Sequence, residues 1–228
     1  MSARLEAAFA GLLARLRATR LVPVLVIDDA ADAAPLAAAL AAGGLPVAEV
    51  TFRTPAAGEA LRRIAGEVPE VLVGAGTVLT PDQAQRAVSA GARFVVAPGF
   101  SPAVVDWCLG HDVPVFPGVC TPTEVEMALA RELTTLKFFP AEAAGGVAYL
   151  KAIAGPYGMV RFIPTGGIGA ANVASYLALK NVVACGGSLM APAQWVRGQE
   201  FERIRAETAA AVAAVAAAAA GGPTGGAR

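Results

Sequence analysis

One lysine lies in a setting that could do chemistry. Residues 135–141 read Thr-Leu-Lys-Phe-Phe-Pro-Ala, which is typical of a short buried strand closed by a proline. Alternate side chains of a strand point to opposite faces, so Thr135, Lys137 and Phe139 share one face. Lys can lose its proton in a protein, whereas Arg cannot. Two interpretations stay open from this stretch: a neutral reactive amine, or a lysine paired with a carboxylate in a structural network.

Three polar residues near predicted strand ends could act with this lysine. Glu49 and Arg53 alternate along the run 47–53, so both point to the face opposite Val50. The apolar face of this strand must lie under the surrounding helices, so Glu49 and Arg53 point to the opposite face, into the barrel. Thr77 ends the next predicted strand by the same alternation. Glu49 and Arg53 alone could form a structural ion pair, but together with Lys137 they predict an active site.

Two glycine-rich turns complete the set. The sequence Thr165-Gly-Gly-Ile-Gly ends one predicted strand, and Gly186-Gly-Ser188 ends the next. Glycines let backbone N–H groups approach an anion closely, and a following helix N-terminus favours negative charge. One glycine pair would only indicate a tight turn. Two pairs at successive strand ends predict a phosphate site.

Metal and cofactor chemistry is disfavoured by the residue types. The chain contains one histidine, His111, and three scattered cysteines, which cannot form a convincing zinc site. Magnesium held by Glu49 together with a substrate remains an alternative. A Ser/His or Cys/His nucleophile would need a histidine in a suitable motif, and His111 lies in a Gly-His-Asp turn. We predict no metal and no cofactor.

The pattern of elements predicts where these residues meet. Eight β-branched runs, each followed by a helical pattern, start roughly 19 to 26 residues apart, which is about the length of one βα unit. We therefore predict an α/β fold with a single (β/α)8 TIM barrel, in preference to a doubly wound open sheet, because no Gly-x-Gly-x-x-Gly follows the first strand. The expected strands are residues 22–27, 47–52, 71–77, 94–99, 113–119, 135–140, 161–166 and 182–188.

The remaining segments and the composition set the protein's broad class. We predict an amphipathic docking helix over residues 1–20, the barrel over 21–197, an Ala-rich helix over 198–220 and a disordered tail over 221–228. Lys and Arg together number 18, as do Asp and Glu, so net charge implies no nucleic-acid and no membrane partner. The number of cysteines is odd, and residues 1–20 do not resemble a secretory signal. Both observations predict a cytoplasmic protein.

Six motifs occur in the order and spacing of a known family. The chain resembles the 2-keto-3-deoxy-6-phosphogluconate aldolases, which often also act on 4-hydroxy-2-oxoglutarate. The resemblance covers about residues 10–195. One departure is Leu189, where family members commonly carry Trp. The motifs are Glu49-Val-Thr-Phe-Arg53, Gly74-Ala-Gly-Thr77, Pro117-Gly-Val, Leu136-Lys137-Phe-Phe-Pro-Ala-Glu142, Pro164-Thr-Gly-Gly-Ile168 and Gly186-Gly-Ser188.

The resemblance implies a class I aldolase, usually a homotrimer, that uses no cofactor. Such an enzyme of Entner–Doudoroff carbohydrate metabolism cleaves its keto-acid phosphate to pyruvate and glyceraldehyde 3-phosphate; 4-hydroxy-2-oxoglutarate would give pyruvate and glyoxylate. Lys137 resembles the Schiff-base lysine and Glu49 the general acid/base. The other expected contacts are Arg53 and Thr77 for the substrate carboxylate, Thr165 and Phe139 for the substrate body, and Gly166, Gly167, Gly186 and Ser188 for the phosphate.

Two other functions use the same residues. A phosphate-binding isomerase or epimerase could employ Glu49 as base and Lys137 as an electrostatic partner. An inactive barrel could bind a sugar phosphate as a sensor, although a binding site has no use for a desolvated amine. Trapping an imine on Lys137 would distinguish the aldolase from both alternatives, and saturable ligand binding without trapping would favour the sensor.

Overall fold

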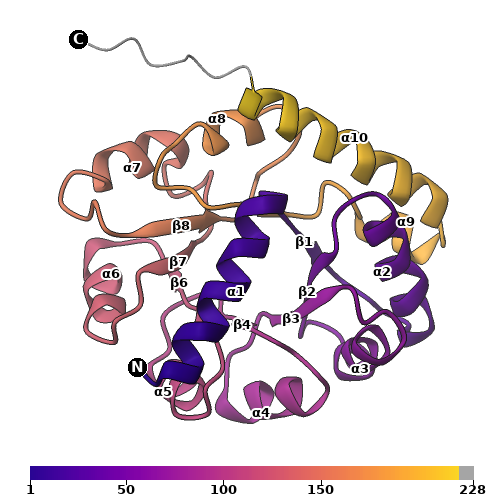
Figure 1. Cartoon of the computed structure of the whole chain (residues 1–228), viewed down its shortest axis with the longest axis horizontal. Helices are drawn as coiled ribbons and strands as arrows, with labels where there is room; N and C mark the ends of the chain where they lie inside the picture. Colours follow the sequence, from indigo (N-terminus) through magenta and orange to yellow (C-terminus); the bar gives the residue numbers. More distant parts are fainter. Residues whose placement is uncertain (221–228) are drawn as a thin grey trace.

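Short parallel strands alternate with helices around a central curled sheet (Figure 1). This computed structural model describes residues 1–220, so the tail predicted for 221–228 lies outside the described residues. The predicted α/β class is confirmed, and each predicted strand is present within its expected range or one residue from it. The strands are β1 (Leu21–Leu25), β2 (Val47–Thr51), β3 (Leu72–Gly76), β4 (Val95–Val96), β5 (Val115–Phe116), β6 (Gly118–Val119), β7 (Thr135–Phe138), β8 (Arg161–Pro164) and β9 (Cys185–Gly187).

Helices follow most strands and surround the sheet (Figure 1). Threonine–proline pairs begin two of them, because Thr80 and Thr121 accept hydrogen bonds from backbone N–H groups of the first turn. Ser101 precedes Pro102 in the same way but makes no such bond. The helices are α1 (Ala3–Thr19), η1 (Ala30–Asp32), α2 (Ala33–Ala42), α3 (Ala57–Glu67), α4 (Pro81–Ser89), α5 (Pro102–Gly110), α6 (Pro122–Leu129), α7 (Gly146–Ile153), α8 (Val173–Leu177), α9 (Ala193–Arg197) and α10 (Phe201–Ala220).

The strands form two parallel ladders rather than one. A six-stranded sheet has the order β5-β4-β3-β2-β1-β9, and a three-stranded sheet has the order β6-β7-β8. Pro117 separates β5 from β6, so the strand expected over 113–119 is split where the backbone lacks an N–H donor. On the other side, isolated bridges join Phe162 to Val182 and Thr165 to Gly186. The parallel arrangement brings the C-terminal ends of the strands to one face.

Helix α1 packs against the N-terminal ends of the strands. Its apolar side is buried at Leu5, Phe9, Leu12 and Leu16, and the Phe9 ring meets Phe116 of β5 edge-on, with the centroids 6.0 Å apart. Figure 1 shows α1 crossing the sheet on the near face. Among the described residues, no helix combines the length and apolar character needed to cross a membrane.

Candidate active site

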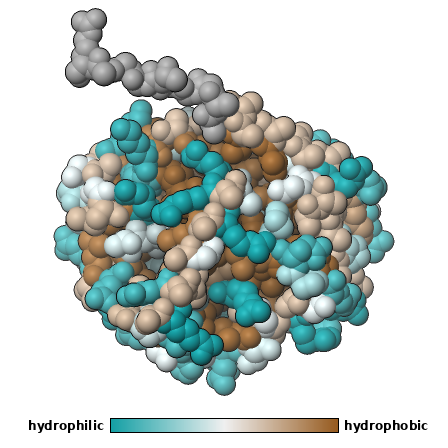
Figure 2. Space-filling model, viewed as in Figure 1, coloured by the Kyte–Doolittle hydropathy of each residue, from teal (hydrophilic) through white to brown (hydrophobic). Residues whose placement is uncertain are grey.

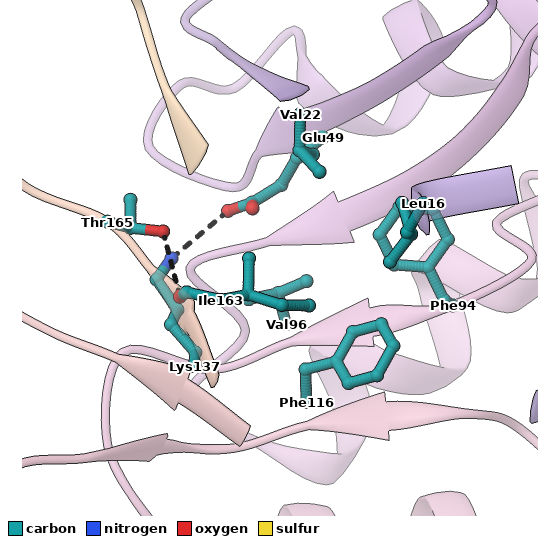
Figure 3. A pocket seen from close by; sticks show the side chains of 9 residues that line it. All are labelled: Leu16, Val22, Glu49, Phe94, Val96, Phe116, Lys137, Ile163 and Thr165. Carbon is teal, nitrogen blue, oxygen red and sulfur yellow. Dashed lines mark hydrogen bonds and ion pairs between the residues drawn. The ribbon is translucent and has the colours of Figure 1, made fainter. Parts of the chain in front are cut away.

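Lys137 and Glu49 form a buried pair between β7 and β2 (Figure 3). The Lys137 Nζ donates to Glu49 Oε1 over 3.3 Å. The two residues are only 4% and 3% exposed, respectively, so the contact is shielded from bulk water. The Phe139 ring centroid lies 5.4 Å from Nζ. A buried amine with one carboxylate beside it is an arrangement that suits proton transfer.

The floor beneath this pair is apolar. A cavity of about 10 Å³ reaches it, which is at most the space for one water. In Figure 3, Leu16 and the rings of Phe94 and Phe116 lie on the far side of this cavity from the amine. Its remaining lining residues are Val22, Glu49, Val96, Lys137, Ile163 and Thr165. Water therefore has little room around Nζ on this side.

A larger cavity of about 390 Å³ opens at the C-terminal ends of the strands. We call it the mouth. Thr165 lines both cavities and so connects the mouth with the buried pair. The mouth is lined by Val24, Val26, Arg53, Phe139, Thr165, Gly166, Gly167, Ile168, Gly187, Ser188, Ala191 and Ala193.

Arg53 is oriented by Thr77. The Arg53 Nε donates to Thr77 Oγ1 over 3.3 Å, which leaves the terminal guanidinium nitrogens free of that bond. Thr77 has φ of 56°, a left-handed conformation that a β-branched residue rarely adopts. Such strained backbone persists where surrounding structure enforces it, typically at functional sites. Thr77 thus follows β3 as a turn residue rather than as the last residue of the strand.

The glycine-rich turn after β8 also needs left-handed backbone. Gly166 and Gly167 have φ of 101° and 77°. A β-carbon on Gly167 would lie 2.7 Å from Cγ of Glu142, so the loops after β7 and β8 are in close contact. The buried Tyr176 hydroxyl donates to the Glu142 carboxylate and holds it there. Burial, with the adjacent carboxylate as a second cause, raises the pKa of Tyr176 above its ordinary value.

Most of the predicted site residues lie in or beside the two cavities. Gly186 differs, because it does not line the mouth; a β-carbon there would collide with Thr165 Oγ1, and the neighbouring Gly187 lines the mouth instead. Leu189 lies partly buried against a separate apolar cavity between α8 and α10. Sequence reasoning missed Val24 and Val26, because a wholly apolar run does not reveal which side faces a ligand.

Metal-binding groups do not converge at this site. Across residues 1–220, no cluster of three or more His, Cys, Asp or Glu side chains could hold a metal ion. Glu49 faces Lys137 instead.

The fold and the site together define a class of protein: a parallel α/β enzyme with a buried lysine–carboxylate pair below a glycine-rich mouth. The profile of the KDPG and KHG aldolases matches residues 12–207. The chain belongs to this family. A 2-dehydro-3-deoxy-phosphogluconate aldolase of Treponema pallidum is 52% identical over 191 residues, covering 84% of this chain and 91% of the relative.

Further relatives agree with this assignment. The KHG/KDPG aldolase of Escherichia coli K12 is 47% identical, over 84% of this chain and 90% of the relative. Among solved structures, the KDPG aldolase of Legionella pneumophila, with pyruvate captured as a covalent carbinolamine, superposes with a TM-score of 0.84. That structure is 42% identical and the match covers 87% of this chain and 96% of the other.

Proposed function

We propose that this protein is a class I aldolase that cleaves 2-keto-3-deoxy-6-phosphogluconate to pyruvate and glyceraldehyde 3-phosphate. The observation that carries the proposal is the 3.3 Å contact between Lys137 Nζ and Glu49 Oε1 beneath the mouth. The family match and the names of the relatives support the substrate class. The name of the E. coli relative also supports cleavage of 4-hydroxy-2-oxoglutarate to pyruvate and glyoxylate.

The proposed reaction begins with a proton transfer. Glu49 accepts a proton from the Lys137 ammonium, and the neutral amine adds to the C2 ketone. Glu49 returns this proton to the departing C2 hydroxyl, so that loss of water gives an iminium and leaves the Glu49 carboxylate ionised again. As the C3–C4 bond breaks, its electron pair moves toward the iminium nitrogen and forms an enamine. Glu49, directly or through one water, takes the C4 hydroxyl proton and so allows the aldehyde to leave.

The second half of the reaction uses the same two residues. The enamine regains a proton at C3 from Glu49, and water then hydrolyses the resulting iminium to release pyruvate and the free amine. One carboxylate can make these transfers if each group comes within hydrogen-bond reach, roughly 2.6–3.2 Å or through one water. The pair is buried, so water enters from the mouth, past Thr165.

The residues that line the mouth suit the two charged ends of the substrate. Arg53 can hold the pyruvyl carboxylate as a bidentate fork, with Thr77 fixing its orientation. Thr165 and Phe139 line the same cavity as Arg53 and the glycine-rich turn, and we assign them as contacts for the substrate body. Backbone N–H groups around Gly166, Gly167 and Gly187, with Ser188, form the proposed phosphate cradle. Gly186 serves this cradle indirectly, by giving Thr165 room.

We also infer the finer architecture and assembly. The two bridges, Phe162 to Val182 and Thr165 to Gly186, and the short break at Pro117 support a closed (β/α)8 barrel made from the two ladders. The family resemblance supports a homotrimer in the cytoplasm. Light scattering of the purified protein tests the trimer, and a monomer mass across the working concentration range would contradict it.

Borohydride trapping tests the proposed function. The protein is incubated with pyruvate, reduced with borohydride and mapped by peptide mass spectrometry. We expect a stable pyruvyl adduct on Lys137, with Lys151 and Lys180 unmodified as internal controls. Adduct formation on another lysine, or none at all, would overturn the Schiff-base mechanism. An isomerase using Glu49 as base would form no adduct.

A further inference from the structure

Four cations line one cavity at the N-terminal ends of the strands. Arg17 lies in the last turn of α1, Arg20 directly precedes β1, Arg161 begins β8, and Lys180 follows α8. They surround a cavity of about 360 Å³, here called the basic cavity. It lies at the end of the strands opposite the mouth. Its other lining residues, among those the structure describes, are uncharged: Leu177, Ala178, Leu179, Val182 and Val183.

These cations lack the partners that arginines have elsewhere on the surface. Arg62, Arg86 and Arg131, for example, each pair with a neighbouring carboxylate. Within the described part of the chain, the four cations of the basic cavity form no salt bridge. Figure 2 shows hydrophilic side chains gathered on both sides of α1 on this face. The whole chain has equal numbers of cations and anions, so this local excess is not a result of a basic composition.

Helix ends explain only part of the cluster. Arg17 is favourable near the C-terminus of α1, and Arg20 donates to the carbonyl of Leu177 at the end of α8. Arg161 donates through one nitrogen to the carbonyls of Gly158 and Val160, at 2.8 and 3.0 Å. These bonds hold Arg20 and Arg161 in place while leaving other guanidinium N–H groups available.

We propose that the basic cavity binds a compact oligophosphate, such as inorganic tripolyphosphate or the phosphate chain of a nucleoside triphosphate. Guanidinium groups bind phosphate oxygens in a bidentate manner, and a lysine adds a mobile point charge. Two of the guanidiniums are already fixed by backbone carbonyls, so less conformational entropy is lost on binding. The four cations are confined to the short stretch between the end of α1, the start of β8 and the end of α8, which suits a short anion better than an extended strand of nucleic acid.

Calorimetric titration of the full chain with inorganic tripolyphosphate tests this site. The test variant is Arg17→Glu with Lys180→Glu, because both side chains are exposed. The matched control is Arg86→Glu with Lys151→Glu, which changes net charge equally at exposed positions outside this cavity. We expect the test variant to lose at least about tenfold in affinity, and the control to bind like the wild type. Arg17→Gln with Lys180→Gln should lose affinity in the same direction.

The phosphate cradle at the mouth is a second anion site, so it must be separated from this one. Ser188→Glu places a carboxylate in the cradle and should leave tripolyphosphate binding to the basic cavity intact. Loss of binding in Ser188→Glu, or equal affinity in the test and control variants, would overturn the proposal. So would an absence of binding to the wild type. Binding of a 20-nucleotide RNA without binding of tripolyphosphate would identify a general polyanion surface instead and would also overturn it. If ATP binds with the same affinity as tripolyphosphate, the site recognises the phosphate chain alone.

Discussion

Gly76 lies directly against the carboxylate of Glu49. A β-carbon on Gly76 would collide with Oε1, the atom that accepts from Lys137. The sheet register explains this, because Glu49 and Gly76 lie on neighbouring parallel strands, β2 and β3. A side chain at the end of β3 would therefore push Glu49 away from the amine.

The first prediction concerns this contact. We expect Gly76→Ala to lower kcat by about 100-fold or more, because a displacement of about 1 Å at a catalytic group costs this much. The measurement is steady-state cleavage with a coupled assay for pyruvate. Gly58→Ala in α3 is the control, since nothing lies within 4 Å of its β-carbon position. That variant should retain full activity and gain about 0.5–1 kcal/mol of stability. Full activity in Gly76→Ala would show that Glu49 need not occupy this position.

A second prediction separates the acid/base from the nucleophile. Glu49→Gln keeps the size of the side chain but cannot accept a proton, so turnover should fall by about 10²–10⁴-fold. Slow trapping of pyruvate on Lys137 should persist, because the amine is still present. Rapid-quench trapping with borohydride measures both effects. Undiminished turnover would assign the proton transfers to another group.

Replacing the amine itself gives a third prediction. Lys137→Arg should abolish turnover and trapping, since a guanidinium cannot form the imine. The positive charge beside Glu49 is retained, so circular dichroism and the unfolding midpoint should change little. Activity as high as a tenth of the wild type would contradict the proposed mechanism.

The loop contact made by Tyr176 leads to a fourth prediction. Tyr176→Phe removes the hydroxyl that donates to Glu142, which packs against Gly167. We expect a loss of about 1 kcal/mol in stability and a higher KM for the phosphorylated substrate. The unphosphorylated analogue should change less, because it makes no use of the cradle. The measurement is kcat/KM for each of the two substrates in the wild type and in Tyr176→Phe. An equal decrease of kcat/KM for both substrates would indicate a purely structural effect.

Buried thiols predict how stability responds to alkaline pH. Burial raises the pKa of Cys108 and of Cys185 from 9.0 to about 12. At a pH between the unfolded and the native pKa, the unfolded chain loses its thiol protons while the native chain keeps them. The free energy of unfolding therefore decreases as pH rises. Each thiol lowers the free energy of unfolding by up to about 1.4 kcal/mol per pH unit in this range. Urea unfolding from pH 8 to 11 should show a shallower decline in Cys108→Ala than in the wild type. Parallel declines would contradict burial as the cause.

Much of the site could be predicted from alternation along strands. Alternation turns Glu49 toward the interior and predicts that it acts together with Lys137, and the structure brings the two side chains together although they lie 88 positions apart in the chain. The ends of the elements were less predictable. Thr77 leaves β3 in a left-handed turn, and Pro117 divides one expected strand in two.

The roles of glycines were the hardest to predict, because a residue without a side chain adds nothing to a pattern of polar and apolar residues. The sequence assigned Gly186 to the phosphate, yet its neighbour in space is the Thr165 hydroxyl. Gly76 attracted no prediction, although it makes room for Glu49. Both relationships depend on which strands become neighbours, and that information lies in the assembled sheet rather than in either segment.

Helix α1 gives the start of the chain an influence on the chemistry. Leu16 closes the underside of the chamber in which an iminium would form, although α1 itself lies at the far end from the substrate entrance. In a protein shortened to begin at residue 20, the small cavity beneath Lys137 and Glu49 would be open to solvent at the N-terminal ends of the strands. The start of the chain would thereby limit the access of water to the covalent intermediates of the proposed reaction.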